Sequence, residues 1–397
     1  MPNNSDSTRS NRQHAFYNNP KIRAYFYQFA LLAGLVYFFY AIVSNTIHNM
    51  EIRGIKSGFD FLSTTAGFDI LMSLIPFDAT YSYGRTFVVG LLNTLLVSII
   101  GIFFATLIGF LVGVSYFSHN WLVKKISLCY TELFRNIPPL LQIFFWYFAV
   151  LAALPSARQS LNFGETVFLN VRGLYLPSLV PQAGAWLVYF GILAAIVSVF
   201  VLRRWAHKRQ DITGLQFPVF SSSLGILFGI PLVCLFLAGI PFTWDIPSLQ
   251  GFNFRGGITI IPELMALSIA LSLYTAAFIA EAVRAGVQSI PHGQTEAARS
   301  LGLKENKIIS LIIIPQAMRV IVPLLNSEYQ SLIKNSTLAT AIGYPDLFTV
   351  FAGTTLNQTG QAIEIIFMLM LSYLTINMIV SFLMNKLNTR VALVERK

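Results

Sequence analysis

Polar side chains that fall inside long apolar runs are the residues of this sequence whose types and spacing could do chemistry. At 100° per residue along a helix, one face of the run 308–336 gathers five of them within about 80° of one another. These are Gln316, Arg319, Asn326, Gln330 and Lys334. Polar groups inside a bilayer face other helices or water rather than lipid. This face is therefore our candidate lining of a water-filled path through a membrane.

A second interpretation of the same face needs no path. Arg319 and Lys334 lie toward opposite ends of the run and could extend to opposite membrane interfaces. Asn326 and Gln330 could then form hydrogen bonds with neighbouring helices. Both interpretations stay open, because the two prolines within the run kink a helix and blur its geometry.

Three further charged residues lie near or within apolar runs. Glu132 and Arg135 are three residues apart, so on a helix they share one face and can pair with each other. Glu281 lies near the end of its run, beside Arg284. Buried charges of this kind usually pair, so we expect a structural ion pair or a gate latch here rather than a substrate contact.

Several kinds of chemistry have no support in the sequence. The five histidines are scattered outside the apolar runs without metal-ligand spacing, so we expect no metal and no cofactor. The dipeptide Gly-Lys does not occur, so no phosphate-cradling loop of the Walker A type is present. Basic residues cluster at the ends of apolar runs and form no stripe with stacking aromatics, which argues against nucleic acid as a partner.

The composition indicates the elements that position these residues. The chain has 397 residues, of which 55% are hydrophobic and 11% charged, whereas soluble domains have about 25% charged residues. A spanning helix needs about 20 apolar residues. This template predicts an all-α membrane protein with about eight transmembrane helices, at 24–44, 86–117, 128–152, 186–202, 217–240, 263–283, 308–336 and 362–384.

The distribution of basic residues predicts the orientation. With the first span retained as an anchor and the N-terminus in the cytoplasm, 19 of the 27 Lys and Arg residues fall in cytoplasmic segments and six in outside loops. Cytoplasmic loops carry the excess of basic residues in membrane proteins. We therefore expect both termini, and the segment between the sixth and seventh spans, to lie in the cytoplasm.

That cytoplasmic segment contains a short predicted helix within 291–303. Pro291 and Gly293 break the preceding helix, Thr295 is the expected N-cap and Gly302 the expected C′ residue. Isolated helices shorter than about 12 residues are marginal in water, so this helix must pack on another surface. An ordinary loop helix packed on its own spans is one explanation, and a docking element for another chain is the other.

The residues of this segment favour docking. The pattern E-A-A, three residues, G, nine residues, I, one residue, L, P is the cytoplasmic signature of ABC importer permeases, and the sequence resembles it closely. The matching residues are Glu296, Ala297, Ala298, Gly302, Ile312, Ile314 and Pro315, with Ile314 in place of the usual Leu. The segments 130–148, 278–294 and 315–338 are also similar to the polar amino-acid (histidine and glutamine) branch of that family.

The resemblance covers five spans and implies a type I ABC importer permease core with additional spans. It divides the chain into 1–85 (cytoplasmic tail, first span and outside loop), 86–152 (first part of the core), 153–262 (an insertion with two extra spans), 263–384 (second part of the core) and the tail 385–397. The eight-span layout resembles one permease of bacterial general L-amino-acid importers. The polar face of the run 308–336 would then line a translocation pathway, and the short helix within 291–303 would couple the permease to an ATPase.

The same resemblance implies the partners and the location. It implies a heterodimer with a second permease subunit, ABC ATPase subunits that hydrolyse the ATP, and a periplasmic amino-acid-binding protein, all at the lipid of a bacterial inner membrane. The permease itself is not expected to be an enzyme. Permeases for opines or other amines are a runner-up, and an ion-driven secondary transporter is a weaker alternative because no paired repeat is apparent. The sequence does not say which amino acids are carried or what the extra spans do.

Overall fold

The computed structural model describes residues 20–52, 54 and 57–391, and it is predominantly helical. The α-helices are α1 Pro20–Ile52, α2 Tyr83–Ser115, α3 Trp121–Asn136, α4 Pro139–Phe144, α5 Ala185–Thr213, α6 Val219–Leu237, α7 Pro262–Gln288, α8 His292–Ser300, α9 Glu305–Ile308, α10 Ile314–Asn335, α11 Leu356–Thr359 and α12 Ala362–Val391. Three π-helical segments, η3 Phe145–Leu151, η5 Ile309–Ile313 and η7 Thr349–Thr355, continue from α4, α9 and the loop before α11. Short 3₁₀ turns are η2 Asp60–Ser63, η4 Ala157–Gln159 and η6 Ser336–Ile342.

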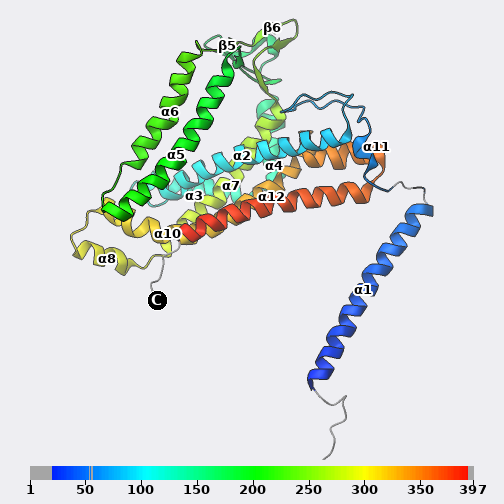
Figure 1. The fold of residues 1–397 in the computed structure, drawn as a ribbon, viewed down its shortest axis with the longest axis horizontal. Coiled ribbons are helices and arrows are strands. Elements are labelled where there is room, and N and C mark those ends of the chain that lie inside the picture. The colour runs from blue at the N-terminus through cyan, green and yellow to red at the C-terminus, as the bar shows by residue number, and fades with distance from the viewer. Residues whose placement is uncertain (1–19, 53, 55–56, 392–397) are drawn as a thin grey trace, which may run out of the picture.

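Helix α7 is the centre of the bundle, and it contacts α2, α3, α4, η3 and α10 (Figure 1). Glycines allow its closest contact. A Cβ added to Gly109 or Gly113 of α2 would lie 2.6 Å from the Cβ of Ile279 or Val283 of α7. The glycine pair four residues apart therefore lets the two backbones approach, as such pairs do in membrane helices.

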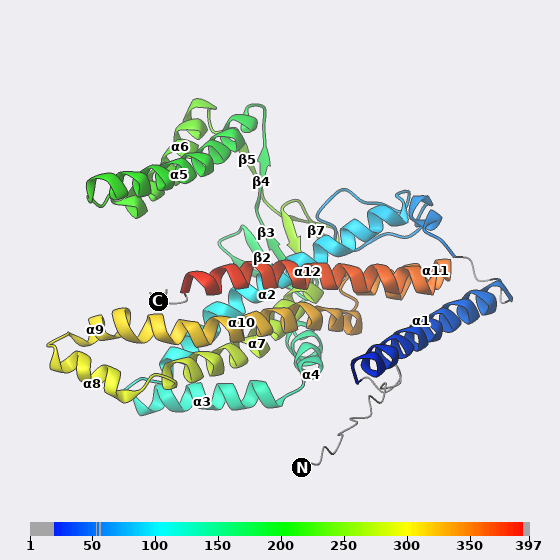
Figure 2. The same ribbon diagram turned by 60° about the horizontal axis from the view of Figure 1, so that its bottom comes forward.

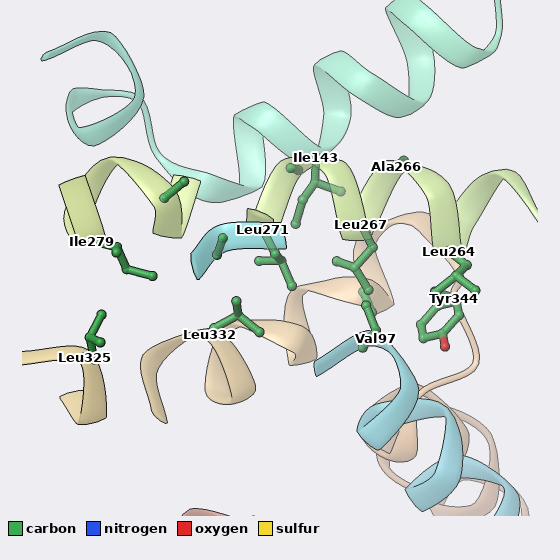
Figure 3. Close-up of a cluster of buried hydrophobic side chains, with 14 of the residues drawn as sticks. Val97, Ile143, Leu264, Ala266, Leu267, Leu271, Ile279, Leu325, Leu332 and Tyr344 are labelled. Atoms are coloured by element: carbon green, nitrogen blue, oxygen red, sulfur yellow. The ribbon is translucent and has the colours of Figure 1, made fainter. Parts of the chain in front are cut away.

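Apolar side chains from four of these elements fill the space around α7. Leu264, Leu267 and Leu271 of α7 are almost fully buried, and they meet Ile143 of α4 and Leu332 of α10 (Figure 3). Close packing, rather than avoidance of water alone, stabilises helix contacts in a bilayer, since lipid tails are as apolar as leucine. This cluster fixes where the polar faces of the bundle point.

Within the described residues, seven helical stretches are long and apolar enough to cross a membrane. They match seven of the eight predicted spans to within a few residues at either end, apart from longer extensions of the observed helices. The remaining one, 128–152, is not a single helix: α3 ends at Asn136, and Ile137 and Pro138 are extended before α4 begins at Pro139. The cause is local, because a residue that precedes proline is disfavoured in the α conformation. The continuation from Pro139 to Leu151 is a shorter apolar helix.

The segment 153–262, which we predicted to be an insertion, contains strands that we did not predict. They are β1 Leu161–Phe163, β2 Val167–Asn170, β3 Gly173–Leu176, β4 Ser178–Pro181, β5 Phe242–Asp245, β6 Ser248–Gln250, β7 Asn253–Arg255 and β8 Ile258–Ile260. They form an antiparallel sheet in the order β1-β2-β3-β8 and the pairs β4-β5 and β6-β7. Runs of three or four residues are too short to show the alternation that identifies a strand.

The two spans of this segment, α5 and α6, pack chiefly on each other. They form a hairpin that leaves the bundle, and the strands join the hairpin to it (Figure 2). Helix α1 is the opposite case: its apolar stretch has no buried residues, and the pictures place it apart from the bundle. All three spans thus offer most of their apolar surface to something other than the bundle.

Candidate coupling helix and translocation face

The N-cap position of helix α8 lies four residues before the expected one. Its N-cap position is Pro291, and no side chain caps it. Thr295, the predicted N-cap, lies inside the helix, and its hydroxyl donates a hydrogen bond to the carbonyl of His292 at 2.6 Å. The prediction was wrong here because a threonine hydroxyl can bond back into its own helix as readily as it can cap one. With nine residues, α8 is still too short to be stable alone.

The C-terminal end of α8 was predicted correctly. Gly302 adopts a φ of +75°, a conformation that glycine adopts without the strain of a Cβ. Its N–H donates to the carbonyl of Arg299, and the N–H of Leu303 donates to the carbonyl of Ala298. These two bonds form a Schellman motif, which satisfies carbonyls at the helix end and turns the chain sharply.

The two alanines of the signature face in different directions. Ala298 is 2% exposed, and α8 contacts α9 and η5 of its own chain. Ala297 and Glu296 are exposed, and Leu301, just beyond the helix, is 80% exposed. The signature therefore includes one alanine that packs on its own chain and one that is open to a partner. The exposed surface of α8 is formed by Glu296, Ala297 and Leu301.

An ion pair and a proline connect α8 to the span that follows. Arg299 Nε donates to Glu305 Oε1 of α9 at 2.7 Å, which raises the pKa of the Arg299 guanidinium. Both side chains are exposed, so the pair contributes little to stability. Pro315 stands at the start of α10, directly after the π-helical η5. A proline lacks the N–H that a regular helix would use there, so η5 relieves the helix ahead of it.

The predicted polar face of α10 is present, and its side chains are partly exposed. Gln316, Arg319, Asn326 and Gln330 are partly exposed, and Lys334 is exposed. The buried residues of α10, among them Ala317 and Leu332, pack toward the core.

Two contacts on this face distinguish its residues. Gln330 Nε2 donates to Asn326 Oδ1 at 3.0 Å, so these amides bond to each other within α10. Among the described residues, Arg319 Nε is enclosed and has no hydrogen-bond partner. A buried donor without a partner costs about 1–3 kcal/mol. An acceptor placed beside Arg319 Nε would remove this cost.

The charged residues of α3 and α7 are paired differently from our expectation. Arg135 reaches Glu281 across the α3–α7 contact at 3.9 Å, and Arg284 forms a second, closer pair with Glu281. Glu132 does not pair with Arg135 but accepts a hydrogen bond from Asn136. The i,i+3 spacing made the pairing of Glu132 with Arg135 possible, but the cross-helix carboxylate attracts Arg135 instead.

Sequence reasoning missed one carboxylate close to this cluster. Glu328 of α10 is partly exposed and lies within electrostatic range of Arg135. A carboxylate inside a predicted span was the available signal. Glu328 does not belong to the five-residue polar face, so the angular pattern passed over it.

A buried polar cluster at the other end of the bundle was also missed. Asn93 of α2 is fully buried, and its amide donates to the carbonyls of Met72 and Pro345 at 2.8 and 2.9 Å. Tyr344 donates back to the carbonyl of Asn93, and Asp346 accepts from Tyr373 of α12. These bonds fix the segment between α10 and α12 to α2.

Several apolar spans packed around α7, with the short helix α8 exposed between two of them, define a multi-span membrane protein. The comparisons give the family. Residues 188–393 match the model of the binding-protein-dependent transport system inner membrane component. The chain belongs to this family, whose members are permeases of ABC importers.

Curated relatives match nearly the whole chain. A putative amino-acid ABC transporter permease of Escherichia coli is 50% identical, with 95% of this chain and 96% of the relative covered. A general L-amino acid transport system permease of Rhizobium johnstonii is 46% identical over 95% and 94%. A glutamate/glutamine/aspartate/asparagine transport permease of Rhodobacter capsulatus is 41% identical, with 92% of each chain covered. The predicted family and permease fold are thereby confirmed, as is a multi-pass inner-membrane protein.

Proposed function

We propose that this chain is the permease subunit of an ATP-driven importer for L-amino acids of broad specificity, and that α8 couples it to an ATPase subunit. The observation that carries the coupling is the exposed surface of α8, formed by Glu296, Ala297 and Leu301. The signature residues Glu296 and Ala297 are therefore accessible to a partner, together with the adjacent Leu301. The Schellman turn at Gly302 holds that surface in a fixed direction.

The path from α8 into the membrane is short and continuous. Ala298 packs α8 on its own chain, and α9, η5 and α10 follow without a break. A push on α8 would therefore reach the polar face of α10, which we propose as part of the translocation pathway. Among α10 residues, Asn326 and Gln330 are the candidates to line it, because their amides already face each other there.

The ion cluster is proposed as a latch for that movement. Glu281 of α7 holds Arg135 of α3 and Arg284 at the same time. Breaking the longer of the two contacts would remove the ion pair between α3 and α7 while Glu281 stayed paired with Arg284. Ion pairs at packed helix contacts can switch between discrete arrangements in this way.

The names of the relatives support the substrate class and the assembly. Three of them are described as amino-acid permeases, and their matches extend over nearly their full length. The proposed assembly has a second permease subunit, two ATPase subunits and a periplasmic binding protein, in a lipid bilayer with both termini of this chain in the cytoplasm. ATP hydrolysis belongs to the partner, in keeping with the missing Walker A pattern.

Reconstitution of the complete complex in liposomes tests this proposal. Glu296→Ala removes an exposed charge of α8, and Gly302→Val forces a β-branched residue into a positive φ at a cost of about 1–2 kcal/mol. We expect ATP-driven uptake of L-glutamine to fall about five-fold or more in both variants. Lys386→Ala changes another exposed charge outside α8 and should leave uptake unchanged.

The pattern of losses identifies the role of α8. If ATP hydrolysis continues in the Gly302→Val complex while uptake stops, coupling has been lost rather than assembly. Full ATP-driven uptake by both α8 variants would show that α8 is an ordinary loop helix. Uptake by this chain without any ATPase subunit would contradict the importer class itself.

A further inference from the structure

A cavity of about 730 Å³ lies where the inserted strands meet the bundle. Its wall combines η3, the start of α7, the turn before β3 and parts of β7 and β8. Figure 2 places β2, β3 and β7 between the bundle and the α5–α6 hairpin. Cavities of about 300–1,000 Å³ are typical of sites for small molecules. Seven polar side chains line this one: Ser73, Tyr147, Arg172, Tyr175, Asn253, Thr259 and Glu263.

One end of the cavity carries a negative charge. Glu263 is in the first turn of α7, and the hydroxyl of Tyr147 donates a hydrogen bond to its Oε1 at 2.8 Å. Oε2 is enclosed, and no residue that the structure describes donates to it. A carboxylate oxygen without a donor is costly away from water. Glu263 therefore keeps one carboxylate oxygen without a donor at this end of the cavity.

A positive charge lines the same cavity from the inserted sheet. Arg172 stands in the turn between β2 and β3, and its backbone N–H donates to Asn170 Oδ1 at 2.8 Å, which fixes the turn. The guanidinium is exposed and makes no ion pair with any of the described residues. It is free to bind an anion.

The sheet register holds these two charges at one site. Strand β3 pairs with β8 so that Leu174 is opposite Ile260. Ile260 precedes Glu263 by three residues, and Leu174 follows Arg172 by two. The register therefore brings the turn that carries Arg172 to the start of α7. Tyr175 extends the polar wall, and its hydroxyl donates to Asn253 Oδ1 at 2.9 Å.

We propose that this cavity binds a free α-amino acid on its way into the permease, with Arg172 on the carboxylate and Glu263 on the ammonium group. The inference rests on the proposed amino-acid substrate and adds a site and a role for the insertion. Opposite charges at one site recognise the groups that all α-amino acids share. The remaining wall includes Leu71, Leu151 and Val171, and a space of this size admits side chains of different kinds.

Equilibrium binding of radiolabelled L-glutamine to the purified complete complex, without the binding protein, tests the site. Two relatives of the ligand each lack one charge: L-glutaminamide has no carboxylate, and N-acetyl-L-glutamine has no ammonium. We expect the wild type to prefer L-glutamine over both by about ten-fold or more. Arg172→Gln should abolish the preference over L-glutaminamide, and Glu263→Gln the preference over N-acetyl-L-glutamine.

A matched arginine provides the control. Arg255 is exposed on β7 of the same insertion but does not line the cavity, so Arg255→Gln should keep both preferences. General damage to folding lowers the affinity for all three ligands together, whereas loss of one charge contact removes only one of the two preferences. The site is contradicted if the wild type binds no L-glutamine or if Arg172→Gln and Glu263→Gln keep both preferences.

The same preparation separates this inference from the proposed function. ATP-driven uptake of L-glutamine by the wild-type complex in liposomes, with the binding protein added, tests the importer assignment. Uptake with unchanged preferences in both variants would overturn the cavity site and leave the importer standing. No uptake of any amino acid by the wild type would overturn the importer and, with it, the passage role of the cavity.

Discussion

Helices α7 and α6 are both long and apolar enough to cross a membrane, yet they occupy opposite kinds of position. Among the seven candidate spans of the described chain, α7 is the least hydropathic and the most buried. Helix α6 is more hydropathic and has almost no buried residues. Hydropathy reports which residues can lie in a bilayer, whereas burial in the bundle depends on a surface that another helix can approach closely.

Small residues make that difference. The buried face of α7 includes Ala266, Ala270, Ala276 and Ala280, and the glycines of α2 lie against it. Helix α6 has large exposed side chains such as Phe228, Leu232 and Phe236. The close packing of α7 therefore stabilises the bundle, whereas the outer surface of the α5–α6 hairpin is available to lipid or a partner.

The largest effect is expected where α2 meets α7. Gly109→Leu places a Cβ 2.6 Å from Ile279 and 2.9 Å from the carbonyl of Ala276, so the helices must separate. We expect a loss of about 3 kcal/mol or more, visible as loss of the monodisperse complex in detergent. Gly225→Leu in α6, where a Cβ meets nothing within 4 Å, should be tolerated. Equal damage from both substitutions would erase the distinction between the two helices.

A smaller loss is expected at the buried polar cluster. Asn93→Ala removes two hydrogen bonds and leaves the carbonyls of Met72 and Pro345 without that donor. The expected cost is about 2 kcal/mol, measured as a lower midpoint of thermal unfolding. Thr375→Ala on α12 removes an exposed hydroxyl bonded to its own helix and serves as the control. An unshifted midpoint for Asn93→Ala would show that the cluster does not hold α2.

The smallest effect on the bundle is expected from the hairpin. Gly191→Val places a Cβ 2.6 Å from Cys234 Sγ and would part α5 from α6. Because the hairpin packs chiefly on itself, we expect the free energy of unfolding of the bundle to change by less than about 1 kcal/mol. In a Cys129→Ser background, Cys234 should react faster with a maleimide. A large drop in bundle stability would mean that the hairpin is part of the core.

The sequence was sufficient for features that repeat along a helix or stand in a fixed pattern. Span length, the signature around Glu296 and the turn at Gly302 follow from local rules. The polar face of α10 followed from its angular period. Each of these depends on residues near one another in the chain.

Features that depend on contacts between distant segments were not predictable in this way. Arg135 chose Glu281 over its neighbour Glu132 because another helix brought the carboxylate within reach. The cavity is lined by residues more than 80 positions apart, Arg172 and Glu263 among them. The strand register that brings them together could not be predicted, because the strands are too short to show a pattern. The break at Pro138 was predictable, because proline restricts the residue before it. We predicted one continuous span instead, because the residues on both sides of the break are apolar.

The central claim is that the exposed side of α8 is covered by an ATPase subunit. The most direct test compares Ala297→Cys with Ala298→Cys, each in a background without Cys129 and Cys234, by cross-linking in the purified complete complex. Ala297 is exposed and Ala298 is buried on its own chain. We predict that Ala297→Cys cross-links to the ATPase subunit and Ala298→Cys does not. Cross-linking at neither position, or equally at both, would contradict the account.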